Sequence, residues 1–205
     1  MFIYIFISIF AAKLQKMDTE RSLYEIEIAL AKSDKFNYIK NIVAFNVNGF
    51  GETLPIHHEC DMLVLSNSGY LTEIEIKRSW QDFLADFKKR HHHESEKRII
   101  KYFYYCVPKK LLDKVWDKLT ELNISYSGVI TYDENLYIEV WGNKYIIDKN
   151  KEYKERGWGT MMKSPILAYQ ARKLYVEERL QVARFGAMRA IMLREKVLKL
   201  QKENI

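Results

Sequence analysis

Residues 59–90 read ECDMLVLSNSGYLTEIEIKRSWQDFLADFKKR, and this stretch decides the predicted fold. Two short apolar runs lie on either side of Asn67-Ser68-Gly69, a tripeptide typical of the turn between two paired strands. The second run leads into a charged segment in which apolar residues recur at helical spacing, namely Trp80, Phe83, Leu84 and Phe87. We therefore expect a β-hairpin followed directly by an amphipathic helix.

Charged side chains are concentrated on one face of the second predicted strand. Alternate residues of a strand share a face, so Glu73, Glu75 and Lys77 are expected to project together. The hairpin can bring Asp61 of the first strand across from Glu75. Hard divalent cations prefer carboxylate oxygens, so this arrangement predicts a metal site beside an ammonium group. The alternative is a structural charge cluster in which Glu75 pairs with Lys77.

The pattern of Asp61 followed by Glu75-x-Lys77 on the next strand resembles the signature of the PD-(D/E)XK nuclease superfamily. Cys60 stands where a proline often precedes the aspartate. The continuation extends the likeness, because EIKRSWQDFLADFKK and then KYFYYCVP are similar to segments of the MmcB-like DNA-repair endonucleases and related phage proteins. The resemblance spans about residues 18–145.

This resemblance implies an α/β fold with a restriction-endonuclease-like αβββαβ core, whose mixed central sheet is flanked by helices. It also implies that the protein hydrolyses phosphodiester bonds in DNA, in DNA repair, recombination or the processing of phage or mobile-element DNA. RNA stays open as a substrate. The implied cofactor is Mg²⁺ or Mn²⁺, and the implied catalytic residues are Asp61, Glu75 and Lys77.

The resemblance also implies a set of metal ligands. Asp61, Glu75 and the backbone carbonyl of Ile76 would hold the cation. An acidic residue of the first helix often joins such a site, and here either Glu20 or Glu27 is available; Glu20 is the stronger candidate. Glu73, one step along the face of Glu75, is expected to support the ligands without touching the metal.

The remaining elements follow from periodicity and from capping residues. The expected order is a helix capped by Asp18 or Thr19 and ending near residue 33, a strand at 41–48, the hairpin, a helix from Ser79, a strand at 99–108, a helix at 109–122, and strands at 127–132 and 136–141. Ser79 and Asp82 fit a capping box, which explains both without catalysis. The polar side of that helix is expected to carry Asp82, Asp86, Lys89 and Arg90.

Lys88, Lys89 and Arg90 begin a basic, histidine-rich segment and are the candidate contacts to nucleic acid. The adjacent histidines 91–93 would point in three directions on a helix, which disfavours a shared metal. The net charge of +6 and the pI near 9.1 suit a polyanionic partner but do not require one. Two cysteines in 205 residues do not make a disulfide framework, so a cytoplasmic location is expected.

The ends of the chain are expected to lie outside the nuclease-like domain at 17–145. Residues 1–16 are an apolar leader or a mis-assigned start upstream of Met17, too short to span a bilayer in the usual way, and no stable membrane association is expected. A basic connector at 146–163 precedes a basic helical arm at 164–205, which Ser164-Pro165 is expected to start. The arm is solvated, clamps DNA or forms a homodimer.

Other functions stay open. The chain is alternatively a nucleic-acid-binding module that keeps the nuclease fold without cutting, or a membrane-tethered or assembly protein built on its apolar start and long helix. A serine or cysteine hydrolase lacks support because the sequence has no nucleophile elbow. Nucleotide hydrolysis lacks support because no glycine-rich phosphate loop is present.

Overall fold

The structure is a computed structural model, and it describes residues 21–48, 53–56, 58–88, 99–124, 126–141, 143–144, 162–163 and 171–203. Several sequence predictions lie outside these ranges, namely those for residues 1–16, Glu20, Lys89, Arg90, the histidines 91–93 and most of the connector at 146–163. None of the helices within the described ranges combines the length and apolarity that a bilayer crossing requires.

The elements follow one another in the predicted order. They are α2 (Leu23–Lys32), β1 (Ile42–Asn48), β2 (Glu59–Leu65), β3 (Leu71–Ile76), α3 (Trp80–Asp86), β4 (Ile100–Pro108), η2 (Lys109–Leu111), α4 (Leu112–Glu121), β5 (Ser127–Tyr132), β6 (Ile138–Trp141), β7 (Asn143–Lys144), β8 (Met162–Lys163) and α5 (Val176–Glu203). The α/β fold with an αβββαβ core is therefore confirmed.

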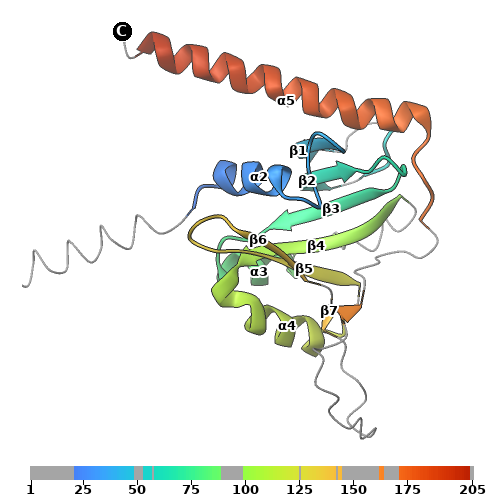
Figure 1. The fold of residues 1–205 in the computed structure, drawn as a ribbon, viewed down its shortest axis with the longest axis vertical. Helices are drawn as coiled ribbons and strands as arrows, with labels where there is room; N and C mark the ends of the chain where they lie inside the picture. The colour runs from blue at the N-terminus through green and yellow to red at the C-terminus, as the bar shows by residue number, and fades with distance from the viewer. Residues whose placement is uncertain are drawn as a thin grey trace, which may run out of the picture.

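Strands β1 to β6 form one mixed sheet in the order of the chain (Figure 1). Strand β2 runs antiparallel to both β1 and β3, whereas β3, β4 and β5 run parallel to one another, and β6 returns antiparallel to β5. The carboxyl ends of the three parallel strands therefore meet at one edge of the sheet, where binding sites of open α/β sheets gather.

The sheet separates two hydrophobic cores. On one face, α2 packs Ile26 and Leu30 against Ile74 of β3 and neighbouring side chains. On the other face, α3 and α4 pack against alternate residues of β4, so β4 is buried on both sides as its aromatic run predicts. Cys60 and Cys106 belong to opposite cores, and both are buried.

Helix α2 begins later than the sequence predicts. Ser22 caps it, because the Ser22 hydroxyl accepts from the Glu25 amide at 3.3 Å while the Glu25 carboxylate accepts from the Ser22 amide at 2.8 Å. The prediction of Asp18 or Thr19 as the cap is therefore wrong. A reciprocal capping box satisfies two amides at once, whereas a lone upstream side chain satisfies one.

The predicted cap of α3 is confirmed. The Ser79 hydroxyl accepts from the Asp82 amide at 3.1 Å, and the Asp82 carboxylate reaches back to the Arg78 amide at 3.1 Å. Asp82 is exposed and directed away from the sheet. Ser79 thus has the predicted role of cap, but the capping box predicted with Asp82 is not completed, because Asp82 accepts from the Arg78 amide and not from the Ser79 amide.

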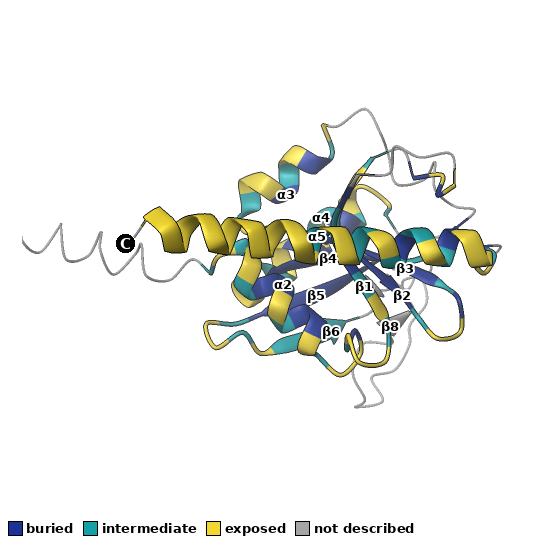
Figure 2. Cartoon of the chain, turned by 90° about the horizontal axis from the view of Figure 1, so that it is seen from above, coloured by how far each residue is buried: buried dark blue, intermediate teal, exposed yellow. Residues whose placement is uncertain are grey.

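Helix α5 lies along the β1 edge of the sheet and extends beyond it (Figure 1). The prediction that the helix begins at Ser164 is wrong, because residues 171–175 are not helical and α5 starts at Val176. This segment is tied to the hairpin turn, where the Leu174 amide donates to the Gly69 carbonyl at 2.9 Å. The first half of α5 buries Val182, whereas the second half of α5 is exposed (Figure 2).

Candidate active site

Asp61 lies where β2 and β3 separate. Their paired residues run from Leu65 and Leu71 at the turn to Met62 and Ile74. Beyond that point the Asp61 side chain replaces a backbone acceptor, because its Oδ2 atom accepts a hydrogen bond from the Ile76 amide at 2.7 Å. Asp61 is thereby held beside the end of β3, as the hairpin prediction requires.

Glu75 and Lys77 form the centre of a buried charge network. The Lys77 ammonium lies 2.6 Å from Glu75 Oε2 and 2.9 Å from Asp86 Oδ1. The Tyr105 hydroxyl donates to the other oxygen of Asp86 at 2.9 Å. The exposed fractions of Glu75 and Lys77 are only 2% and 3%. The two residues that the sequence predicts to act together are therefore in direct contact, inside the protein.

Asp86 is the site residue whose environment the sequence prediction misses. It was expected on the polar side of α3, but it is buried and bonded to Lys77. The reason is that α3 packs against β4, where Phe83 contacts Tyr105, so its inward face brings Asp86 to Lys77 just beyond the end of β3. A sequence signal was present, because Asp86 follows the buried Phe83 by three residues and thus shares its helical face.

The electrostatic environment of Glu75 favours its protonated form. Burial, and then the nearby charge of Asp61, raise the pKa of Glu75 to about 7, although Lys77 lowers it. The Oε1 atom of Glu75 is buried without a hydrogen-bond partner among the described residues. A buried carboxylate oxygen in this state is costly unless a proton or a cation satisfies it.

The neighbours of Lys77 keep it charged despite its burial. Burial alone would lower the pKa of Lys77, but the carboxylates of Glu75 and Asp86 raise it well above its usual value. Burial, and then the charge of Asp86, likewise raise the pKa of Tyr105, so its hydroxyl stays protonated and donates. The network is thus an ammonium held by two carboxylates, one of which Tyr105 orients.

Helix α2 contributes an acidic residue close to Asp61. Glu27 is 4% exposed, and its Oε1 atom accepts from the Asn46 amide group at 2.9 Å. Burial raises the pKa of Glu27, the Asn46 hydrogen bond and the charge of Arg189 lower it, and the charge of Asp61 raises it. The acidic candidate that the structure places near Asp61 is therefore Glu27, while Glu20 lies outside the described residues.

Glu73 has a separate set of partners. It is fully buried, and its Oε1 atom lies 2.6 Å from His58 Nε2. Cys60 Sγ lies 3.4 Å from the same nitrogen. The negative charge of Glu73 contributes to the raised pKa of Glu75. Glu73 thus influences the candidate site through its charge, and it is anchored to His58.

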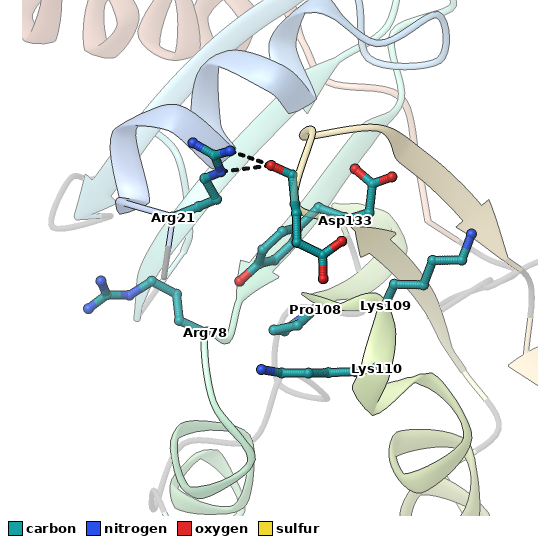
Figure 3. A pocket seen from close by; sticks show the side chains of 8 residues that line it. Arg21, Arg78, Pro108, Lys109, Lys110 and Asp133 are labelled. Atoms are coloured by element: carbon teal, nitrogen blue, oxygen red, sulfur yellow. Dashed lines mark hydrogen bonds between the residues drawn. The ribbon is translucent and has the colours of Figure 1, made fainter. Parts of the chain in front are cut away.

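A basic pocket lies at the carboxyl ends of the parallel strands (Figure 3). Arg78 follows Lys77 at the end of β3, and Lys110 follows the end of β4. Arg21 donates to the Glu134 carbonyl across the pocket, and Lys109 pairs with Glu139 at 2.7 Å. The remaining lining residues are Pro108, Tyr132 and Asp133. Lys88, predicted to contact nucleic acid, is exposed just after α3.

No protein-family model matches the sequence, and no curated protein matches it either. Among solved structures, the chain is similar to a protein of unknown function from Silicibacter pomeroyi, with 18% sequence identity and a TM-score of 0.44. The similarity covers 80% of this chain and 83% of the other. The function therefore has to be inferred from the residues themselves.

Proposed function

We propose that this protein is a metal-dependent nuclease that hydrolyses phosphodiester bonds in DNA, with Asp61, Glu75 and Lys77 as its catalytic residues. The observation that carries the proposal is Glu75, whose buried Oε1 atom has no hydrogen-bond partner among the described residues and lies beside Asp61 and Lys77. Proteins rarely bury a carboxylate oxygen in this way without a ligand for it.

The donors suit a hard cation. Asp61 and Glu75 offer carboxylate oxygens, and the Ile76 amide donates to Asp61, so the carbonyl of the same extended residue is directed to the same side. These three groups would hold Mg²⁺ or Mn²⁺. The bound cation would polarise a phosphoryl oxygen and lower the pKa of a coordinated water. Glu27 of α2 is the further acidic residue near this position.

Lys77 would act on the reacting groups directly. Its ammonium would orient the attacking water or offset the negative charge that develops on phosphorus. Asp86 would be a positioning residue, because it contacts the same Lys77 ammonium as Glu75, and Tyr105 orients Asp86 in turn. A lysine fixed by two carboxylates in this way loses little further freedom when the substrate binds.

The basic pocket would hold the substrate backbone. Arg78 and Lys110 line it at the ends of β3 and β4, immediately beyond Lys77. Arginine and lysine side chains neutralise phosphates and supply affinity without sequence preference. A nucleic-acid strand bound in this pocket would pass the carboxyl end of β3, where Lys77 lies.

The test is cleavage of labelled DNA and RNA substrates by the full chain with Mg²⁺, Mn²⁺ or EDTA. Asp61→Asn keeps the size of the side chain and should lower cleavage by about 100-fold or more. Glu121→Gln, on the exposed side of α4, is the matched control and should cut normally. Metal-dependent cleavage that survives Asp61→Asn unchanged would remove the proposed site.

A second function is favoured by one observation. Lys77 is already engaged by two buried carboxylates, as in a structural ion network. The chain would then be a non-catalytic module that retains the nuclease fold and binds nucleic acid. Salt-sensitive DNA binding by both the wild type and Asp61→Asn, without cleavage by either, would support this function and contradict the nuclease.

A further inference from the structure

Three donors of different chemistry converge beside the candidate active site. His58 directly precedes β2, Cys60 lies near the start of that strand, and Glu73 lies on β3. One nitrogen, one sulfur and one carboxylate oxygen of these residues all lie within 4.8 Å of one another. Cys60 and Glu73 are fully buried, and the side chain of His58 is 13% exposed. The cluster is thus nearly closed to solvent.

Hydrogen bonding alone accounts poorly for this arrangement. The Nε2 atom of His58 lies 2.6 Å from Glu73 Oε1 and 3.4 Å from Cys60 Sγ. One ring nitrogen carries at most one proton, so it cannot serve both neighbours well as a donor. In a hydrolytic triad the acid and the thiol use opposite ring nitrogens, whereas here both approach Nε2. The three donor atoms instead lie close enough together to share one ion.

We propose that His58, Cys60 and Glu73 bind one Zn²⁺ ion, at a site distinct from the one formed by Asp61 and Glu75. A thiolate, an imidazole and a carboxylate are the donors that Zn²⁺ takes in proteins, whereas Mg²⁺ and Ca²⁺ take oxygen ligands. Zn²⁺ binding requires the thiolate of Cys60, so the thiol proton is released to solvent. Three protein ligands leave a fourth tetrahedral position for water.

The surrounding charges favour a cation at this place. Glu73 and Glu75 are two residues apart on one strand, and both are buried. The buried ammonium of Lys77 contacts Glu75 and Asp86. A divalent ion at the cluster would offset the charge of Glu73 directly. This inference does not depend on the nuclease proposal.

The experiment uses the full chain, stripped of metal and titrated with Co²⁺ in place of Zn²⁺. Tetrahedral Co²⁺ bound to a thiolate absorbs strongly in the visible, with a sulfur-to-cobalt charge-transfer band in the near ultraviolet. Both features should grow to saturation at one ion per chain, and Zn²⁺ should abolish them. Their absence from the wild-type protein would overturn the proposal.

Two cysteine variants make the test specific. Cys60→Ala should lose the charge-transfer band, whereas Cys106→Ala, which removes the other buried thiol, should keep it. A band of equal strength in Cys60→Ala would overturn the proposal. His58→Ala provides a second variant at a partly exposed position, in case Cys60→Ala does not fold. It should bind Co²⁺ at least tenfold more weakly, and unchanged affinity would contradict the site.

A stability readout completes the design. Zn²⁺ bound only by the folded chain should raise the midpoint of thermal unfolding in proportion to the logarithm of its concentration. The rise should occur in the wild type and in Cys106→Ala and should be lost in His58→Ala. An equal rise in all three proteins would assign the binding to another place and overturn the proposal. No cleavage assay enters this test, so its outcome is independent of the nuclease proposal.

Discussion

Lys77 is the residue on which the buried charges of the candidate site depend. It is the shared partner of Glu75 and Asp86, and all three side chains are nearly inaccessible to water. Removing one member of a buried ion network leaves the others uncompensated, which costs more than the network contributes. We expect Lys77→Met to lower the free energy of unfolding by about 3–5 kcal/mol, as measured by urea denaturation at neutral pH.

The control for this prediction neutralises the partners as well. The triple variant Glu75→Gln, Lys77→Met, Asp86→Asn removes all three charges and should be more stable than Lys77→Met alone. Equal stability of the single variant and the wild type would contradict the network. A loss of cleavage in a Lys77 variant therefore does not by itself report on catalysis, which is why Asp61→Asn is the sharper probe.

Glu75 makes stability depend on pH. Its pKa is about 7 in the folded protein against a usual value of 4.5, so the folded chain binds more protons than the unfolded chain between these values. The free energy of unfolding should therefore fall as the pH rises from about 4.5 to about 7, by up to about 3 kcal/mol. Glu75→Gln lacks this titration, and parallel pH profiles of the two proteins would contradict the assignment.

At the scale of single residues, the sequence predicts the identity of Asp61, Glu75 and Lys77 but not their surroundings. The alternation of a strand places Glu75 and Lys77 on one face without any knowledge of the fold. That Asp86 and Tyr105 complete the network depends on how α3 packs against β4, which no local pattern specifies. Burial, which raises the pKa of Glu75, is likewise a property of the packed molecule.

At the scale of elements, Gly186 shows why α5 can approach the sheet. A Cβ atom at this position would lie 2.9 Å from the backbone oxygen of Val43 on β1. Alanine is the better helix former by about 1 kcal/mol, but this contact would force α5 away from β1. We expect Gly186→Ala to destabilise the protein by about 1–3 kcal/mol in urea denaturation, because the gain in helix propensity is smaller than the steric cost.

A substitution at the neighbouring position 187 measures the effect of helix propensity on stability without the steric contact to β1. Ala187 is exposed on α5, and Ala187→Gly should cost only the propensity difference of about 1 kcal/mol. If Gly186→Ala instead stabilised the protein, the close approach of α5 to β1 would be wrong. Helix α5 is continuous through this glycine, from Val176 to Glu203.

Element boundaries show where local signals fail. Ser22 rather than Asp18 or Thr19 caps α2, because Glu25 lies at the position that completes a capping box. Helix α5 starts at Val176, because the Leu174 amide donates to Gly69 of the hairpin turn and the segment at 171–175 is therefore not helical. The first error is local and was visible in the sequence. The second depends on a contact between segments more than a hundred residues apart, which periodicity cannot show.

At the scale of the whole molecule, positive charge gathers at the edge where the parallel strands end. If this edge binds DNA, the double variant Arg78→Ala, Lys110→Ala should weaken binding and reduce the slope of log affinity against log salt by about 2. Lys40→Ala is the matched control, because Lys40 is exposed beyond the start of β1, at the opposite end of the sheet. Fluorescence anisotropy over a salt series measures the affinity and its salt dependence. Equal slopes for the wild type, the double variant and Lys40→Ala would contradict this interface.

The hairpin, the order of strands and helices, and the position of Asp61 beside the end of β3 were all determined by contiguous residues. Turn chemistry and a period of two or 3.6 residues act over short distances, so one sequence contains these signals. The network of Lys77, Asp86 and Tyr105, the convergence of His58, Cys60 and Glu73, and the burial of Glu27 were decided only by the tertiary structure. They join side chains from different strands, helices and loops whose contacts form only when these segments pack together, and the desolvation that shifts their pKa values exists only in the packed molecule.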